Sequence, residues 1–280
     1  MTTTTWFGEP VVRIGGPKLA ALVSPERGGK IVSLVDENDR EWLAQPASPL
    51  PPPAEPGTVF TAAELCGWDE CAPTVDRDTY FDEHGEGADL GDHGDLWTQR
   101  WQDHGTQARV VSPSLGFDFA RSITPTGRGL RLEYVVRSER DLPLLWAAHP
   151  QFVAPPGSRV QVPNGTVLRG QDGSELGPEV LEIDAYADGE CRKFHADPGE
   201  RVGWASLVLP SDERLTLCWS ASAPYLGIFM DAAAIAKRRV AVIEPMSGWP
   251  DSLTAAVDSG HVARITPDHP LTIRLEIGVG

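Results

Sequence analysis

Apolar and polar residues alternate along many short segments of this chain. In segment 130–136, apolar residues at the even positions alternate with Arg131, Glu133 and Val135, and segment 271–277 alternates in the same way. A period of two indicates strands with one buried face. We expect strands in segments 11–14, 19–24, 30–35, 109–112, 117–123, 130–137, 142–148, 180–183, 206–209, 215–220, 226–230, 240–244, 262–266 and 271–277.

Turn residues separate these segments. The chain has 28 Gly and 25 Pro, and pairs such as Asn164-Gly165 and Asp172-Gly173 mark tight turns. No apolar set keeps a helical period for three turns, and residues 231–237 could form two helical turns at most. Many closely spaced strands without intervening helices predict an all-β protein, a large sandwich of antiparallel sheets. Without an internal repeat or a shift in composition, the 280 residues are expected to form a single domain.

A proline-rich segment, residues 44–58, interrupts the strand pattern. Proline fixes φ and removes a backbone donor, so this segment cannot form a central strand or a helix. We interpret it as a surface loop between strands. A linker or an SH3-type ligand is the alternative.

Charge and cysteine content narrow the classes of partner. The formal net charge is −16, from 24 basic and 40 acidic residues. Such a field disfavours nucleic acid and anionic membranes and suits a neutral small molecule, although acidity can also serve solubility alone. The four cysteines lack disulfide or zinc-site spacing, and the start of the chain is unlike a signal peptide. These features predict a cytoplasmic protein with free thiols.

Two neighbouring segments, 64–76 and 90–101, concentrate polar and aromatic residues. His93 lies in a tight loop between Gly91 and Gly94, and Trp97 follows closely. Carboxylates, an imidazole and indole faces suit a sugar, because planar polar groups bind hydroxyls and aromatic faces cover the CH face of the ring. A solvated turn beside core tryptophans is the alternative interpretation.

Two strand ends carry the remaining candidate groups. His149 ends an apolar strand, where burial lowers and a nearby carboxylate raises the pKa of an imidazole; a satisfied core histidine is the alternative. Glu244 ends a second apolar strand and precedes Pro245. Its reduced hydration suits a general base, unless it only pairs with Arg238 or Arg239.

Taken in order, these segments resemble the aldose 1-epimerase (galactose mutarotase) superfamily. The resemblance runs over residues 28–253 and is carried by GGKIVSLVDENDREWL, DHGDLW, WAAHPQF and VIEPMSGWPDSL. It implies a β-supersandwich with an open concave site and interconversion of sugar anomers. It also implies that His149 protonates the ring oxygen, that Glu244 takes the anomeric proton, and that His93 holds a hydroxyl. Neither a cofactor nor a metal is implied, and the histidines show no HxH or HExxH spacing.

Departures from the family pattern bear on the substrate. GWDECAPT replaces an Asn-Arg stretch, so Asp69 and Glu70 are expected to accept hydroxyls or else to shape a loop. Trp97 stands where phosphosugar members have an arginine, which favours an unphosphorylated sugar, although Arg100 could substitute. Trp97 and Trp249 are expected to contact the sugar.

Two alternatives from other classes remain open at this point. One is a non-catalytic carbohydrate-binding protein of the same fold, suggested by the nine tryptophans and the missing arginines. The other is a lyase or hydrolase on a similar sandwich, in which Glu244 acts together with Asp69 or Glu70.

Overall fold

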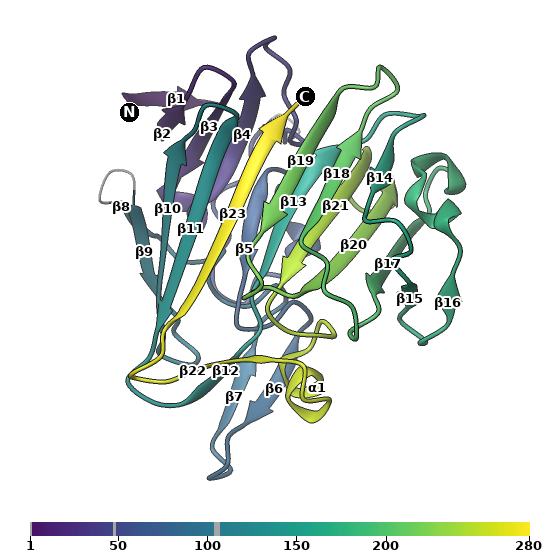
Figure 1. Cartoon of the computed structure of the whole chain (residues 1–280). Helices are drawn as coiled ribbons and strands as arrows, with labels where there is room; N and C mark the ends of the chain where they lie inside the picture. The colour runs from purple at the N-terminus through teal and green to yellow at the C-terminus, as the bar shows by residue number, and fades with distance from the viewer. Residues whose placement is uncertain (1, 47–48, 104–106) are drawn as a thin grey trace.

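The computed structural model describes residues 2–46, 49–103 and 107–280, and two large antiparallel sheets dominate it (Figure 1). The larger sheet has eleven strands. Their order is β1 (Thr2–Trp6), β2 (Glu9–Gly15), β3 (Leu19–Ser24), β4 (Lys30–Asp36), β5 (Trp68–Cys71), β13 (Ala147–Val153), β21 (Arg239–Met246), β20 (Tyr225–Ala232), β17 (Cys191–Ala196), β15 (Leu168–Gly170) and β16 (Glu175–Leu176).

The second sheet has eight strands and packs against one face of the first. Their order is β14 (Arg159–Gln161), β18 (Trp204–Val208), β19 (Arg214–Trp219), β23 (Leu271–Val279), β11 (Gly129–Arg137), β10 (Asp118–Pro125), β9 (Gln107–Val111) and β8 (Gln102–Asp103). Two small ribbons, β12 (Leu142–Leu144) with β22 (Ala263–Ile265) and β6 (Asp78–Phe81) with β7 (Gly87–Leu90), lie at one end of the sandwich in Figure 1.

The alternation seen in the sequence explains how the second sheet buries one face. Strands β11 and β23 pair with Leu130 opposite Ile277 and Leu132 opposite Leu275, and these side chains are buried. Arg131 and Glu276 form an ion pair on the other face. A single set of buried apolar residues extends from Ile14 to Ile277 between the sheets. The predicted all-β antiparallel sandwich is therefore confirmed.

The central strands of the larger sheet, β13 and β21, are buried on both faces. Only Val153 of β13 and Arg239 of β21 are partly exposed. One face of these strands packs on the second sheet, and the other lies under loops. Polar residues that point toward the loops are therefore shielded from water, which is the setting in which an imidazole or a carboxylate acquires an unusual pKa.

Several sequence-based expectations differ from the structure. Segment 180–183, predicted as a strand, belongs to two 3₁₀ turns, Pro178–Leu181 and Ile183–Ala185. Val180 and Ile183 are both buried, one in each turn, and their odd separation does not match the alternation of a strand with one buried face. Segment 142–148 divides after Leu144, where β12 leaves to pair with β22.

Helical structure also falls elsewhere than expected. Residues 231–237 form no helix; instead, the Asp231 carboxylate accepts the backbone N–H groups of Ala234, Ile235 and Ala236. A short helix, α1 (Leu253–Asp258), forms where none was expected, with the Ser252 hydroxyl at its N-cap. In the proline-rich segment, positions 47 and 48 lie outside the described residues, and the remainder carries neither helix nor strand.

Candidate functional site

The strand register brings His149 and Glu244 together on one face of the larger sheet. In the β13–β21 pair, Ala147 lies opposite Met246 and Gln151 opposite Val242, so His149 lies opposite Glu244. Side chains of directly opposite residues start about 5 Å apart. We call His149, Glu244 and Gly227 the first row, because Gly227 of β20 lies opposite Glu244 on the next strand.

Two further rows follow along the same strands on the same face. The second row is Gln151, Val242, Phe229 and Lys193, and the third row is Val153, Val240 and Asp231. Adjacent rows are two residues apart along each strand, which corresponds to roughly 6.8 Å.

These rows form the floor of a cavity of about 180 Å³. His149, Glu244 and His93 all line it, together with Lys193 and Asp251. Pockets for drug-sized ligands usually hold roughly 300–1,000 Å³, so this cavity suits a smaller molecule. The two residues expected to transfer protons, His149 and Glu244, therefore share one small cavity with His93, which is expected to hold a hydroxyl.

His149 is 6% exposed, and its Nδ1 atom has no hydrogen-bond partner among the described residues. Burial lowers the pKa of His149 well below its ordinary value, and the nearby His93 and Lys193 lower this pKa further. The imidazole is consequently neutral at pH 7 in the ligand-free protein.

His93 reaches the cavity from the loop between β7 and β8. Its φ of 62° is left-handed, and its backbone N–H donates to Val75 O at 2.6 Å. The imidazole stacks on Phe60 with a centroid distance of 3.8 Å and an interplanar angle of 10°. Its centroid lies 4.7 Å from that of His149, and Nδ1 contacts Asp92 Oδ1 at 2.9 Å. The loop thus presents His93 edge-on to His149.

Glu244 is fully buried and forms an ion pair with Lys193. Lys193 Nζ also lies 3.3 Å from Asp251 Oδ1, and this carboxylate oxygen is 3.1 Å from His195 Nε2. Burial raises the pKa of Glu244, and the Lys193 ammonium opposes that rise. For Asp251, burial also acts to raise the pKa, but Lys193 and His195 outweigh it and hold the pKa below its ordinary value.

Oε1 of Glu244 has no hydrogen-bond partner among the described residues. The carboxylate therefore combines one oxygen paired with Lys193 and one oxygen available to a ligand in the cavity. That arrangement suits a group that accepts a proton from a bound molecule.

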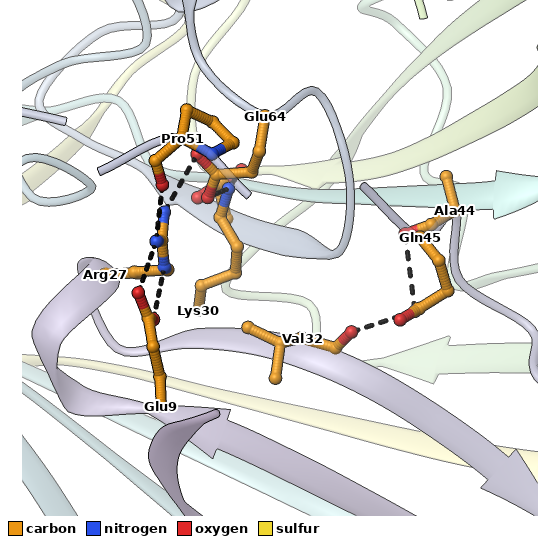
Figure 2. Close-up of polar contacts among 9 residues, drawn as sticks. Glu9, Arg27, Lys30, Val32, Ala44, Gln45, Pro51 and Glu64 are labelled. Atoms are coloured by element: carbon orange, nitrogen blue, oxygen red, sulfur yellow. Dashed lines mark hydrogen bonds and ion pairs between the residues drawn. The ribbon is translucent and has the colours of Figure 1, made fainter. Parts of the chain in front are cut away.

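A second buried charge network lies beside the first row. Lys30 Nζ is 2.6 Å from Glu64 Oε1 and 3.3 Å from Asp69 Oδ2, and Asp69 lies opposite His149 on β5. Figure 2 shows Arg27 between Glu9 and the carbonyl of Pro51, with Lys30 turned toward Glu64. Burial raises the pKa of Asp69 to about 6, and Lys30 opposes this rise. This network ties the proline-rich segment and the N-terminal strands to the back of the site.

Asp69 and Glu70 point to opposite faces of β5, because successive residues of a strand alternate. Glu70 enters the sandwich, where its carboxylate accepts hydrogen bonds from Arg121, Tyr134 and Trp146 at 2.9–3.0 Å. Neither Asp69 nor Glu70 lines the cavity. The expectation that they accept sugar hydroxyls, or act with Glu244 as a hydrolytic carboxylate pair, has no support in this geometry.

Three other expected contact residues also lie outside the cavity. Arg100 is largely exposed and paired with Glu26 at 2.8 Å, so it cannot supply the cation of a phosphosugar site. Trp97 is buried, donates from Nε1 to Asp92 O, and lines a neighbouring depression. Trp249 packs beside His195 and His261 at centroid distances of 6.5 and 5.7 Å.

Lys193 and Asp251 are the site residues that sequence patterns did not single out. Segment 191–196, CRKFHA, mixes polar and apolar residues without clear alternation, so its strand was not predicted. Asp251 lies in the stretch VIEPMSGWPDSL, where nothing in the pattern distinguishes it from the other polar residues. A charged residue in a weakly patterned segment gives no signal until the strand order places it beside a carboxylate.

Within the described ranges, no group of three or more His, Cys, Asp or Glu residues is arranged to hold a metal ion. The helices in the same ranges are too short or too polar to cross a membrane. All four cysteines are free, and Cys66 and Cys71 are buried.

Solved structures with a similar backbone are numerous. The Slr1438 protein from Synechocystis sp. PCC 6803 superposes with a TM-score of 0.74 at 15% identity, covering 100% of this chain and 99% of that one. A galactose mutarotase-like protein from Clostridium acetobutylicum gives 0.72 at 17% identity, covering 100% and 98%. A second galactose mutarotase-like protein, from Lactobacillus casei ATCC 334, has a TM-score of 0.72 at 17% identity, and the match covers 96% of this chain and 100% of that one.

No protein-family model and no curated protein sequence matches the chain. The structural matches span nearly the whole length of both partners, which confirms the resemblance at the level of the fold. The chain therefore has the galactose-mutarotase-like fold. Because fold alone does not determine activity, the function must be argued from the site.

Proposed function

We propose that this protein is an aldose 1-epimerase that interconverts the α and β anomers of an unphosphorylated sugar. The observation that carries the proposal is the placement of His149 opposite Glu244 on the floor of one small cavity, with His93 beside them. Ring opening needs one group that gives a proton and one that takes a proton, and this pair can supply both.

The reaction moves two protons and breaks one bond. Glu244 removes the proton of the anomeric hydroxyl through its available oxygen. The fraction of His149 that is protonated, which grows as pH falls, delivers a proton to the ring oxygen. The bond between C1 and the ring oxygen breaks and gives the open-chain aldehyde. Rotation about C1–C2 and reclosure, with the two groups in exchanged roles, yields either anomer.

The pKa shifts of the two groups assist this exchange. An ordinary histidine has a pKa about two units above that of a glutamate. Burial lowers the pKa of His149 and raises that of Glu244. Both shifts make it easier for a proton to leave the imidazole and to reside on the carboxylate, which is the direction of transfer that ring opening requires.

Charge in the cavity supports an unphosphorylated substrate. The lining includes the carboxylates of Asp76, Asp231, Glu244 and Asp251 against the single ammonium of Lys193. That ammonium is already paired with two of these carboxylates. A phosphate would therefore meet a negative field without a free cation. The free thiols fit a reducing compartment, and we propose the cytoplasm.

Polarimetry on freshly dissolved aldoses tests the proposal. We expect the wild type to accelerate equilibration of at least one sugar, and Glu244→Gln to reduce the rate by about 10²–10⁴-fold, because a general base is lost. Glu83→Gln makes the same chemical change at an exposed side chain and should match the wild type. Equal rates for Glu244→Gln and the wild type would refute the proposal.

The ion pair between Lys193 and Glu244 favours one second candidate, a non-catalytic sugar-binding protein. A carboxylate held by an ammonium is a weaker base, and the same pair could bind hydroxyls without turnover. Calorimetric binding of a sugar, unchanged in Glu244→Gln and accompanied by no acceleration of mutarotation, would select this candidate.

A further inference from the structure

The cavity changes character between the first row and the rows beyond it. The first row carries the imidazole and the carboxylate, whereas the second and third rows contribute Val242, Phe229 and Val240 to the lining. Ile235 also faces the cavity there, from the loop after β20.

The polar residues of the second and third rows are already matched within the protein. The Gln151 side chain lies between Leu65 O and Cys66 N. With the amide oriented so that its nitrogen faces the carbonyl, it donates to Leu65 O and accepts from Cys66 N, both at 3.1 Å. The Asp231 carboxylate accepts the N–H groups of residues 234–236. Lys193 turns back toward Glu244 and Asp251.

Of the other polar residues in the lining, Thr61, Asp76 and Gln171 are exposed to solvent, whereas His93 and Asp251 lie beside the groups of the first row. A ligand group that lies over the second and third rows therefore meets hydrocarbon. The apolar rows matter for a sugar that lies along the strands, because adjacent rows are roughly 6.8 Å apart. With the anomeric carbon and ring oxygen over the first row, the opposite edge of a pyranose extends toward Val242 and Phe229. A hydroxyl on that edge would lose its hydration without gaining a partner, whereas hydrogen or methyl would pack favourably.

We propose that the preferred substrate is a deoxysugar, an aldose in which hydrogen replaces the hydroxyl at C3, C4 or C6, so that a CH2 group or the C6 methyl group lies over the second and third rows. This inference rests on the proposed epimerase function. It is carried first by the apolar lining, which consists of Val240, Val242 and Phe229. It is carried second by Gln151, Asp231 and Lys193, whose polar groups already form hydrogen bonds or ion pairs within the protein.

Magnetisation-transfer NMR can measure kcat/KM for glucose and galactose and for the 3-, 4- and 6-deoxy derivative of each. At least one deoxysugar should exceed its parent by roughly 10- to 100-fold, the usual range for an apolar pocket that meets an extra hydroxyl. Parents that equal or exceed all of their deoxy derivatives would overturn the inference and leave the epimerase function intact. No acceleration for any of these sugars would refute the proposed function, and the inference with it.

A shape-matched variant tests the role of the lining directly. Val242→Thr keeps the side-chain shape and adds a hydroxyl beside the ligand. The ratio of kcat/KM for the deoxysugar to that for its parent should therefore fall by at least about threefold. Val240→Thr serves the same purpose if Val242→Thr does not fold. Val135→Thr, on β11 of the other sheet, is the matched control and should keep the wild-type preference. A preference that is unchanged in the cavity variant would overturn the inference.

Discussion

Lys193 reaches across Gly227 to form its ion pair with Glu244. Lys193 lies opposite Phe229 in the second row, whereas Gly227 lies opposite Glu244 in the first, so the lysine crosses the sheet diagonally. A Cβ atom on Gly227 would lie 3.2 Å from Lys193 Nζ and 3.0 Å from Met246 Sδ. The glycine thus leaves the space through which the ammonium reaches the carboxylate.

Replacing Lys193 by Met should raise the pKa of Glu244. The ammonium now opposes the effect of burial, so its removal leaves burial unopposed and the glutamate protonated at higher pH. A base works only in its ionised form, so the limb on which kcat/KM rises with pH should move upward by at least one pH unit. Lys193→Arg keeps the charge and should keep the wild-type limb. An unmoved limb in Lys193→Met would show that the ammonium does not set the basicity of Glu244.

Substitution of Gly227 by Ala should weaken the same ion pair without removing either charge. The added methyl crowds the far ends of two flexible side chains, so we expect a stability loss of about 1–3 kcal/mol, typical of overpacking. The pH limb of Glu244 should shift in the same direction as in Lys193→Met, and by less. Gly127→Ala is the control, because a Cβ there meets nothing within 4 Å. Wild-type pH profiles for both glycine variants would contradict the diagonal contact as a determinant of basicity.

The descending limb of the pH profile, on which kcat/KM falls as pH rises, should report the environment of His149. Burial lowers the pKa of this imidazole, so its protonated form is populated only on the acid side of its ordinary value near 6.5. If His149 gives the proton to the ring oxygen, kcat/KM should fall as pH rises through an apparent pKa below 6.5. Stopped-flow polarimetry with subtraction of the buffer-catalysed rate measures this value. An apparent pKa above 7 would assign the acid to a different group.

Glu70 should matter for stability and not for turnover. Its carboxylate binds Arg121 inside the sandwich, and removing one partner of a buried ion pair costs about 3–5 kcal/mol. Urea unfolding of Glu70→Gln should show a loss of this size. The folded fraction should keep the wild-type kcat, because Glu70 faces away from the cavity. A collapse of kcat with unchanged stability would place Glu70 in the chemistry.

The sequence predicted the fold well where alternation was strong. Segments 130–137 and 271–277 form the adjacent strands β11 and β23, because their apolar faces are needed to cover the core. The prediction is wrong at 180–183, where the two buried residues, Val180 and Ile183, lie in separate 3₁₀ turns and at an odd separation that a half-buried strand does not show. Short elements such as α1 depend on a single cap, Ser252, and on tertiary contacts that composition does not reveal.

The site was predictable where a polar residue interrupts an apolar strand, and at His93, which stands between two glycines beside tryptophan. His149 and Glu244 stand out in the first way, and the register places them opposite each other. Lys193 could not be predicted as a site residue, because it comes close to Glu244 only when β17 pairs with β20. The order of strands in a sheet cannot be read from the local sequence pattern. Asp69 and Glu70 are neighbours on one strand, so their side chains point to opposite faces of the sheet. The sequence pattern does not reveal which of these faces holds the cavity.

The central claim is that His149 and Glu244 act as one proton-transfer unit. The most direct test is magnetisation transfer between the α- and β-anomeric protons of a substrate sugar, measured for His149→Asn, Glu244→Gln and the double variant. We predict that each single variant loses about 10²–10⁴-fold and that the double variant loses little more, because groups that act together are not additive. Wild-type exchange in either single variant, or losses that multiply in the double variant, would contradict the account.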